Sequence, residues 1–198
     1  METAPGTPIL LSILSVLGLV LLNAFFVAAE FSLVGARKTR LDEMAQNGDR
    51  KAILARRAGQ SLTKFISVTQ LGITLTSLGL GWIGEPALAK IFVGMFAWLP
   101  DPLSKIATHG VAATVAFILI SVLHIVLGEL VPKALALIYP ELIVTWLILP
   151  LLAVRWTLAG PAFLPNCTAN APPRLFRVPP PNPSARPPSP DAARLPAG

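Results

Sequence analysis

The sequence predicts an all-α membrane protein with three transmembrane helices, additional re-entrant and juxtamembrane amphipathic helices, and a disordered proline-rich tail. Three observations predict this fold class. Of the 198 residues, 54% are hydrophobic and only 13% are charged, compared with roughly 25% charged residues in ordinary soluble domains. Residues 3–29, 65–84 and 110–128 form apolar runs without any Asp, Glu, Lys or Arg. Basic residues instead gather between the first two runs.

Each apolar run is close to the ~20 residues that an α-helix needs to cross a bilayer, so each is expected to span the membrane. The first run is not expected to be a cleaved signal peptide. The chain begins Met1-Glu2-Thr3 without a basic residue, and its apolar run exceeds the about 7–15 residues of a signal core. The single cysteine, Cys167, excludes a disulfide framework and a multi-cysteine metal site.

The distribution of charge predicts the orientation of the helices. Seven of the sixteen Lys and Arg residues lie within residues 37–57, between the first two runs, together with three acidic residues. By the positive-inside rule this connection is cytoplasmic, so the N-terminus is expected outside, and the third run is expected to end inside at Glu129, Pro132 and Lys133. The basic stretch 37–57 is expected to contact anionic lipid headgroups rather than nucleic acid.

The segments between and after the runs differ in character. Residues 36–60 have helical apolar spacing broken at Asn47-Gly48-Asp49, which predicts two amphipathic helices on the inner membrane face. The proline-interrupted residues 86–106 are interpreted as interfacial or re-entrant. Residues 134–154 are either a fourth span or a membrane-associated helix pair, and we favour the pair because Glu141 and Pro150 divide them into short pieces.

The C-terminal end of the chain has a different composition. Twelve of the last 38 residues are proline, and such a segment cannot bury a core, so it is expected to be disordered or polyproline-like. The sequence therefore predicts a membrane domain over residues 1–160 and a tail over residues 161–198.

Polar residues inside the apolar runs are candidates for function, because such groups normally face a bundle interior or a wet cavity. In the first run, Asn23 and Glu30 are seven residues apart and share one helix face. Helix packing is the alternative interpretation for the small and hydroxyl residues. Glu30 can alternatively be the solvated end of its helix, and Glu129 an interfacial residue paired with Lys133 one turn on. In the second run a polar stripe recurs at steps of three and four residues: Thr63, Ser67, Gln70, Thr74, Ser77 and Gly81.

Pro132 favours a functional role for the third run. Proline has no N–H, so the carbonyl of Gly128 loses its helical hydrogen-bond partner beside the Glu129 carboxylate. Hard oxygen ligands of this type suit Mg²⁺, Ca²⁺ or Na⁺, and broken helices recur at ion sites in transporters. His124 lies five residues before Glu129, which does not match a zinc-protease spacing. No catalytic pairing is found, so an enzyme is not expected.

Three stretches in order, LLNAFFVAAEFSLVGARKTRLDEMAQNGDRKA, FISVTQLGITLTSLGLGWIGEPALA and VLHIVLGELVPKALAL, resemble the transmembrane module of the CNNM/CorC family. These are magnesium exporters, also described in bacteria as hemolysin-like proteins. The resemblance implies a homodimer in the plasma (bacterial inner) membrane that binds dehydrated Mg²⁺ in a central acidic cavity and exports it, with Na⁺ as coupling ion. By motif it implies these ion-site residues: Glu129, Gly128, Glu30, Thr74 and Ser77.

The resemblance has two departures. Many relatives have an SGSE stretch where this chain has Val27-Ala28-Ala29-Glu30, and asparagines where it has Ile73 and Ser77. The family usually continues into a pair of CBS domains that bind adenine nucleotide, and no such segment is found in this sequence, so this chain is expected to bind no ATP. The alternative function is a non-transporting membrane anchor or a truncated, vestigial member of the family.

Overall fold

The computed structural model describes residues 9–84, 86–87 and 112–158, and all helices of this part belong to one compact unit of the chain. No strand occurs among the described residues, which confirms the all-α fold class. The re-entrant segment expected at 86–106 lies almost entirely outside the described residues, as does the tail expected at 161–198. The helices are α1 (Ile9–Gly35), α2 (Lys38–Gln46), α3 (Arg50–Gln60), α4 (Leu62–Gly79), η1 (Leu80–Gly84), α7 (Ala112–Leu123), η3 (His124–Leu130), α8 (Val131–Ile138) and α9 (Pro140–Leu158).

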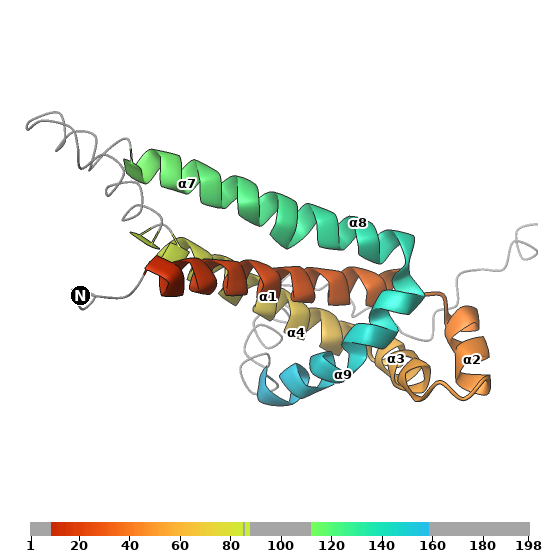
Figure 1. The fold of residues 1–198 in the computed structure, drawn as a ribbon. Coiled ribbons are helices and arrows are strands. Elements are labelled where there is room, and N and C mark those ends of the chain that lie inside the picture. Colours follow the sequence, from red (N-terminus) through yellow and green to blue (C-terminus); the bar gives the residue numbers. More distant parts are fainter. Residues whose placement is uncertain (1–8, 85, 88–111, 159–198) are drawn as a thin grey trace, which may run out of the picture. The chain divides into compact units, whose positions relative to one another are not determined.

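The three expected spans are present as long apolar helices. They comprise Leu11–Gly35, Leu62–Gly84 and Thr114–Ile138, with mean hydropathies of 2.4, 1.3 and 2.3. Helix α1 has 27 residues and is therefore about 40 Å long, more than the roughly 30 Å of a hydrocarbon core. It is the central helix, with α7 and α8 along one side and α4 and α9 on the other (Figure 1).

The expected end of the third span at Pro132 is wrong. The helix continues through Pro132 to Ile138, because the seven residues of η3 adopt the wider π-helical form just before it. The N–H of Val131 bonds to the carbonyl of Val126, five residues back. Pro132 then falls in the first turn of α8, and it offers no N–H to the carbonyl of Gly128 four residues before it.

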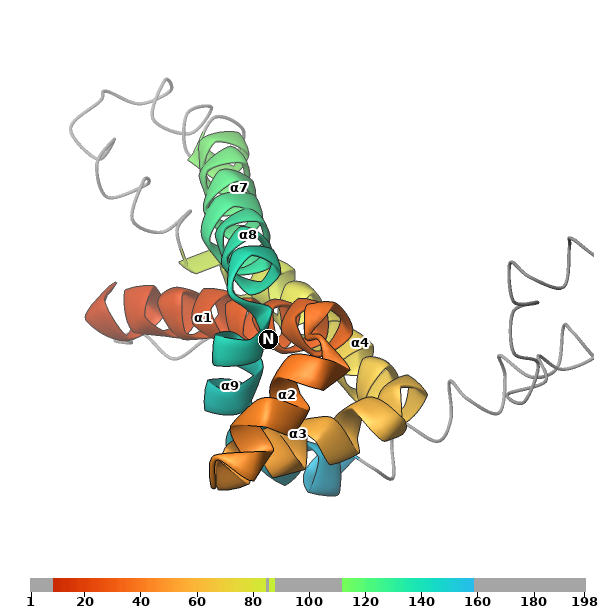
Figure 2. The ribbon, with the colours of Figure 1, turned by 90° about the vertical axis from the view of Figure 1, so that its right-hand side faces the viewer.

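Helix α9 also corrects an expectation, because Pro150 lies inside it and does not divide it. Its 18 residues Pro140–Thr157 are long and apolar enough to make a fourth candidate span. Its buried face packs on the ends of α1 and α3, and the α9 helix lies beside α3 in both views (Figures 1 and 2). At its start, Arg37 Nε lies 3.0 Å from Glu141 Oε1, and near its end Arg155 stacks 4.7 Å from the Phe65 ring.

The two short amphipathic helices expected over residues 36–60 are confirmed as α2 and α3. The chain reverses at Gly48, whose φ of 91° favours glycine. Asp49 caps α3 by accepting from the backbone N–H groups of Lys51 and Ala52. The apolar sides of both helices face inward through Leu41 on α2 and three alanines on α3, Ala52, Ala55 and Ala58.

Candidate functional site

Asn23 is the centre of a polar network between three membrane helices. This α1 side chain is only 2% exposed. Its amide nitrogen donates to the carbonyl oxygen of Gly128 on η3 at 3.0 Å. Its amide oxygen accepts from the Thr76 hydroxyl on α4 at 2.7 Å, with the Ser77 hydroxyl 3.5 Å away. One side chain thus ties α1 to α4 and to η3.

His124 extends the network along η3. Its Nε2 lies 3.5 Å from the Ser77 hydroxyl. The ring also covers Gly128, because a Cβ added there would lie 2.8 Å from His124 Cδ2 and 3.4 Å from Asn23 Nδ2. Only glycine therefore allows the backbone of η3 to approach Asn23 this closely. His124 contacts the site rather than only packing between helices.

Pro132 cannot donate to the Gly128 carbonyl, which accepts instead from a side chain on another helix. In an α-helix this oxygen would accept from the N–H of residue 132, which proline lacks. A buried carbonyl normally has a partner, since an unsatisfied one costs about 1–3 kcal/mol. Here Asn23 supplies the partner from another helix. The Gly128 oxygen can therefore be reached by side chains, and in this conformation it accepts a hydrogen bond from the Asn23 amide.

A second polar contact lies two turns further along α1. The Thr69 hydroxyl on α4 donates to Glu30 Oε2 at 2.8 Å, and Thr69 is fully buried. Asn23 and Glu30 are seven residues apart, about 10 Å along the helix, and so are their partners Thr76 and Thr69. Because α1 and α4 are antiparallel neighbours, the two contacts form successive rungs between them.

The other predicted site residues lie elsewhere in this chain. Glu129 is exposed on η3, and none of the three ion pairs among the described residues includes it. Lys133, its expected alternative partner, stacks 4.6 Å from the Phe31 ring. Thr74 is exposed and donates to the Gln70 carbonyl of its own helix at 2.8 Å. The network thus brings Gly128 and Ser77 together, and leaves Glu129, Thr74 and Glu30 outside it.

The residues that sequence reasoning placed outside the ion site are Asn23, Thr69 and Thr76. The two threonines fall one or two positions off the polar stripe of α4, on the face that packs against α1. Thr69 and Thr76 are seven residues apart, as are Asn23 and Glu30. This shared spacing points to the two contacts only when α1 and α4 are taken as antiparallel neighbours.

The donor atoms around Asn23 define the chemistry that the site can support. Within residues 9–84, 86–87 and 112–158, no three His, Cys, Asp or Glu side chains come together as a metal-binding group. The available ligands are amide, hydroxyl and carbonyl oxygens, which suit hard cations such as Mg²⁺ or Na⁺. These oxygens already take part in hydrogen bonds here, so a cation would have to replace those bonds.

The fold and this buried polar network define a multi-pass α-helical membrane protein with polar groups at membrane depth. The family model for the cyclin M transmembrane N-terminal domain, CNNM, matches residues 13–192. The chain therefore belongs to the CNNM family, which confirms the resemblance of its three motifs.

Relatives of this chain come from several bacteria. It is 47% identical over 121 residues to the UPF0053 protein YhdT of Bacillus subtilis (strain 168), covering 60% of this chain and 25% of that protein. It is 41% identical over 174 residues to the uncharacterized protein Rv1841c of Mycobacterium tuberculosis, covering 87% and 48%. It is 30% identical over 138 residues to the polyamine export protein of Haemophilus influenzae, covering 67% and 30%. The chain thus spans between a quarter and about half of these relatives.

Proposed function

We propose that this chain is the membrane module of a divalent-cation exporter that carries Mg²⁺, with Na⁺ as the coupling ion. The observation that carries the proposal is the buried Asn23 network, in which the Asn23 amide donates to the Gly128 carbonyl on η3 and accepts from the Thr76 hydroxyl on α4. Polar groups at membrane depth are costly, and they normally mark an ion or substrate path. If the network served helix packing alone, there would be no need for a proline whose missing N–H leaves the Gly128 carbonyl free for a side chain.

The two rungs between α1 and α4 support a path with two positions. A cation entering near Glu30 would displace the Thr69 hydroxyl from the carboxylate, since both compete for the same oxygen. At Asn23 it would displace the Thr76 hydroxyl, which can return to the carbonyl of Gly72, 2.8 Å away on its own helix. Alternative acceptors of this kind allow the network to open without leaving a buried hydroxyl unpaired.

Exposed polar groups favour a homodimer. Glu129 is exposed on η3, and Thr63, Gln70 and Thr74 of the polar stripe are exposed on α4. In a bilayer these groups are expected to face protein or a wet cavity rather than lipid. We propose that a second copy covers them, and that Glu129 and Thr74 contribute to a central cavity between the two copies.

The charge distribution supports a location in the plasma membrane with α2 and α3 on the cytoplasmic side and the N-terminus outside. Both helices come from the stretch that carries seven basic and three acidic residues between two spans. Basic residues of this kind are retained on the cytoplasmic side. In this orientation Glu30 is nearer the cytoplasm than Asn23.

The Haemophilus influenzae relative is a polyamine export protein, which favours a polyamine as a second candidate cargo. A polyamine is a flexible organic cation whose ammonium groups would pair with carboxylates, so Glu30 and Glu129 would matter more than the Asn23 amide. A non-transporting membrane anchor is the remaining alternative.

The test is a flux assay on the full chain in liposomes, with an Mg²⁺-sensitive dye or labelled spermidine. For Mg²⁺ transport, Asn23→Leu and Glu129→Ala should each lower the rate by about tenfold or more, equivalent to about 1.4 kcal/mol. Ser15→Ala, which alters an exposed hydroxyl on the same α1 helix, should leave it unchanged. Spermidine flux without Mg²⁺ flux would favour the polyamine. Mg²⁺ transport that survives Glu129→Ala would refute the ion site, and absence of flux for both cations would favour the anchor.

A further inference from the structure

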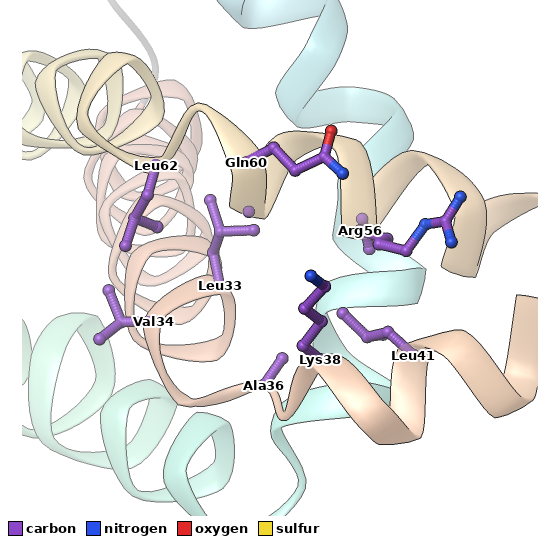
Figure 3. A pocket seen from close by; sticks show the side chains of 10 residues that line it. Leu33, Val34, Ala36, Lys38, Leu41, Arg56, Gln60 and Leu62 are labelled. Carbon is purple, nitrogen blue, oxygen red and sulfur yellow. The ribbon is translucent and has the colours of Figure 1, made fainter. Parts of the chain in front are cut away.

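A pocket of about 310 Å³ lies at the basic end of the helix bundle, away from the Asn23 network. It is bordered by the end of α1, by α2, by the end of α3 and by the first residue of α4 (Figure 3). Helix α1 ends at Gly35, so the pocket is at the level where a spanning helix leaves the hydrocarbon core. This is the depth of phospholipid headgroups.

One wall of the pocket is apolar and leads toward the bilayer. Leu33 and Leu41 are buried, with exposures of 5% and 4%. Val34 beside them is 56% exposed, and Leu62 completes this wall from α4. An acyl chain lying across these residues would pass from the pocket onto the lipid-facing surface of α1 and α4.

The opposite side of the pocket is polar and cationic. Lys38 extends its amino group into the pocket, on the side where the amide of Gln60 lies (Figure 3). Lys38 belongs to none of the three ion pairs among the described residues.

Arg56 also lines the pocket, but its guanidinium is turned away from Lys38 and Gln60 (Figure 3). Its Nη1 is held by Asp42 at 3.0 Å. Its Nε is buried, so a ligand in the pocket does not reach it. Lys38 and the amide of Gln60 therefore make up the polar side of the pocket.

We propose that this pocket binds one anionic phospholipid, with its phosphate at Lys38 and Gln60 and an acyl chain along Leu33, Val34 and Leu62. The combination of a cationic wall with an apolar wall that opens toward the bilayer selects a lipid over a soluble anion. A pocket of this size accommodates a headgroup and the start of one chain, while the rest of the lipid stays in the bilayer. This site is independent of which ion the protein carries.

Native mass spectrometry of the purified full chain tests the proposal, with phosphatidylglycerol as the probe and phosphatidylcholine as the neutral comparison. Phosphatidylglycerol should bind more tightly than phosphatidylcholine. Lys38→Gln should weaken that binding about fivefold, as expected from about 1 kcal/mol per basic side chain. Lys64→Gln is the matched control, because Lys64 is exposed near the start of α4 and does not line the pocket. It should leave binding unchanged.

A second variant fills the pocket without crowding the protein. Gly59 lines it, and a Cβ added there meets no atom within 4 Å. Gly59→Leu should abolish tight phosphatidylglycerol binding while the helix content and thermal stability are retained. Equal losses in Lys38→Gln and Lys64→Gln would overturn the proposal in favour of diffuse surface attraction. Equal binding of phosphatidylcholine, or displacement of the lipid by equimolar glycerol phosphate, would also overturn it.

Discussion

Replacing Asn23 by leucine should destabilise the helix bundle through the hydrogen bonds it removes. The two side chains have similar volumes, so the change leaves no large cavity. The substitution removes the donor to Gly128 and the acceptor for Thr76, bonds of 3.0 and 2.7 Å. Any loss of stability therefore reports the polar network rather than packing.

The expected magnitude follows from what each former partner does next. The Thr76 hydroxyl can return to the Gly72 carbonyl, 2.8 Å away, so its loss is small. The Gly128 oxygen is buried and has no N–H from Pro132 to replace the Asn23 amide, which should cost about 1–3 kcal/mol. Interhelical hydrogen bonds in membranes average about 0.6 kcal/mol and reach about 1.7. We therefore expect a loss of about 1–3 kcal/mol in the free energy of unfolding.

Reversible unfolding in mixed detergent micelles, followed by tryptophan fluorescence, measures this difference. Ser15→Ala is the matched control, because it removes a 2.7 Å hydrogen bond on the same helix that is exposed and local, to the Leu11 carbonyl. Its effect should stay within about 0.5 kcal/mol. If Asn23→Leu is as stable as the unmodified chain, the Gly128 carbonyl has another partner and the reasoning about Pro132 is wrong.

Three further substitutions test other parts of the fold by the same unfolding measurement. Gly72→Ala would place its Cβ 2.5 Å from the Phe26 ring, so α1 and α4 should separate slightly at a cost of about 1–3 kcal/mol. Asp49→Ala removes the side-chain cap of α3 and should cost about 1 kcal/mol. Arg37→Gln breaks the ion pair with Glu141 and should cost at most about 1 kcal/mol, with the loss shrinking at high salt.

Each of these predictions has a matched control. Phe26→Leu in the Gly72→Ala background should recover part of the lost stability, and no recovery would mean that the ring is not the obstacle. Ser61→Ala changes an N-cap of α4 that forms no side-chain cap, so an effect equal to that of Asp49→Ala would contradict the capping argument. Arg40→Gln alters an ion pair exposed on both sides and should have a smaller effect than Arg37→Gln.

Much of the fold could be predicted from apolar run length and charge placement. These patterns predict the three long helices and the paired short helices around Gly48, because each depends on local composition. The continuation past Pro132 and through Pro150 could not be predicted in the same way. Proline breaks a helix only where no wider turn or partner absorbs its missing N–H, and that depends on tertiary contacts.

The sequence predicts the kind of candidate site, but not which residues form it. The sequence indicates that oxygen-bearing side chains at membrane depth carry the function, and Gly128 and Ser77 do meet at Asn23. Periodicity alone selects the stripe containing Thr74, whereas the face of α4 that packs on α1 carries Thr69 and Thr76. The two faces of α4 differ by one or two residue positions. Which of them packs on α1 depends on the tertiary structure and is not visible in the periodicity.

The π-helical segment His124–Leu130 makes chain length, rather than composition, the sensitive property of the third membrane helix. Each residue of an α-helix turns the chain by about 100°. A π-helical turn closes each hydrogen bond over one residue more than an α-helical turn does. Deleting one residue within this segment should therefore let it relax to a regular helix while the parts before and after it keep nearly the same orientation. The spacing between His124 and the buried Gly128 would change, so the loss should appear at Asn23 rather than along the rest of the helix. Exposed positions here, such as Ile125 and Leu127, should tolerate many apolar residues.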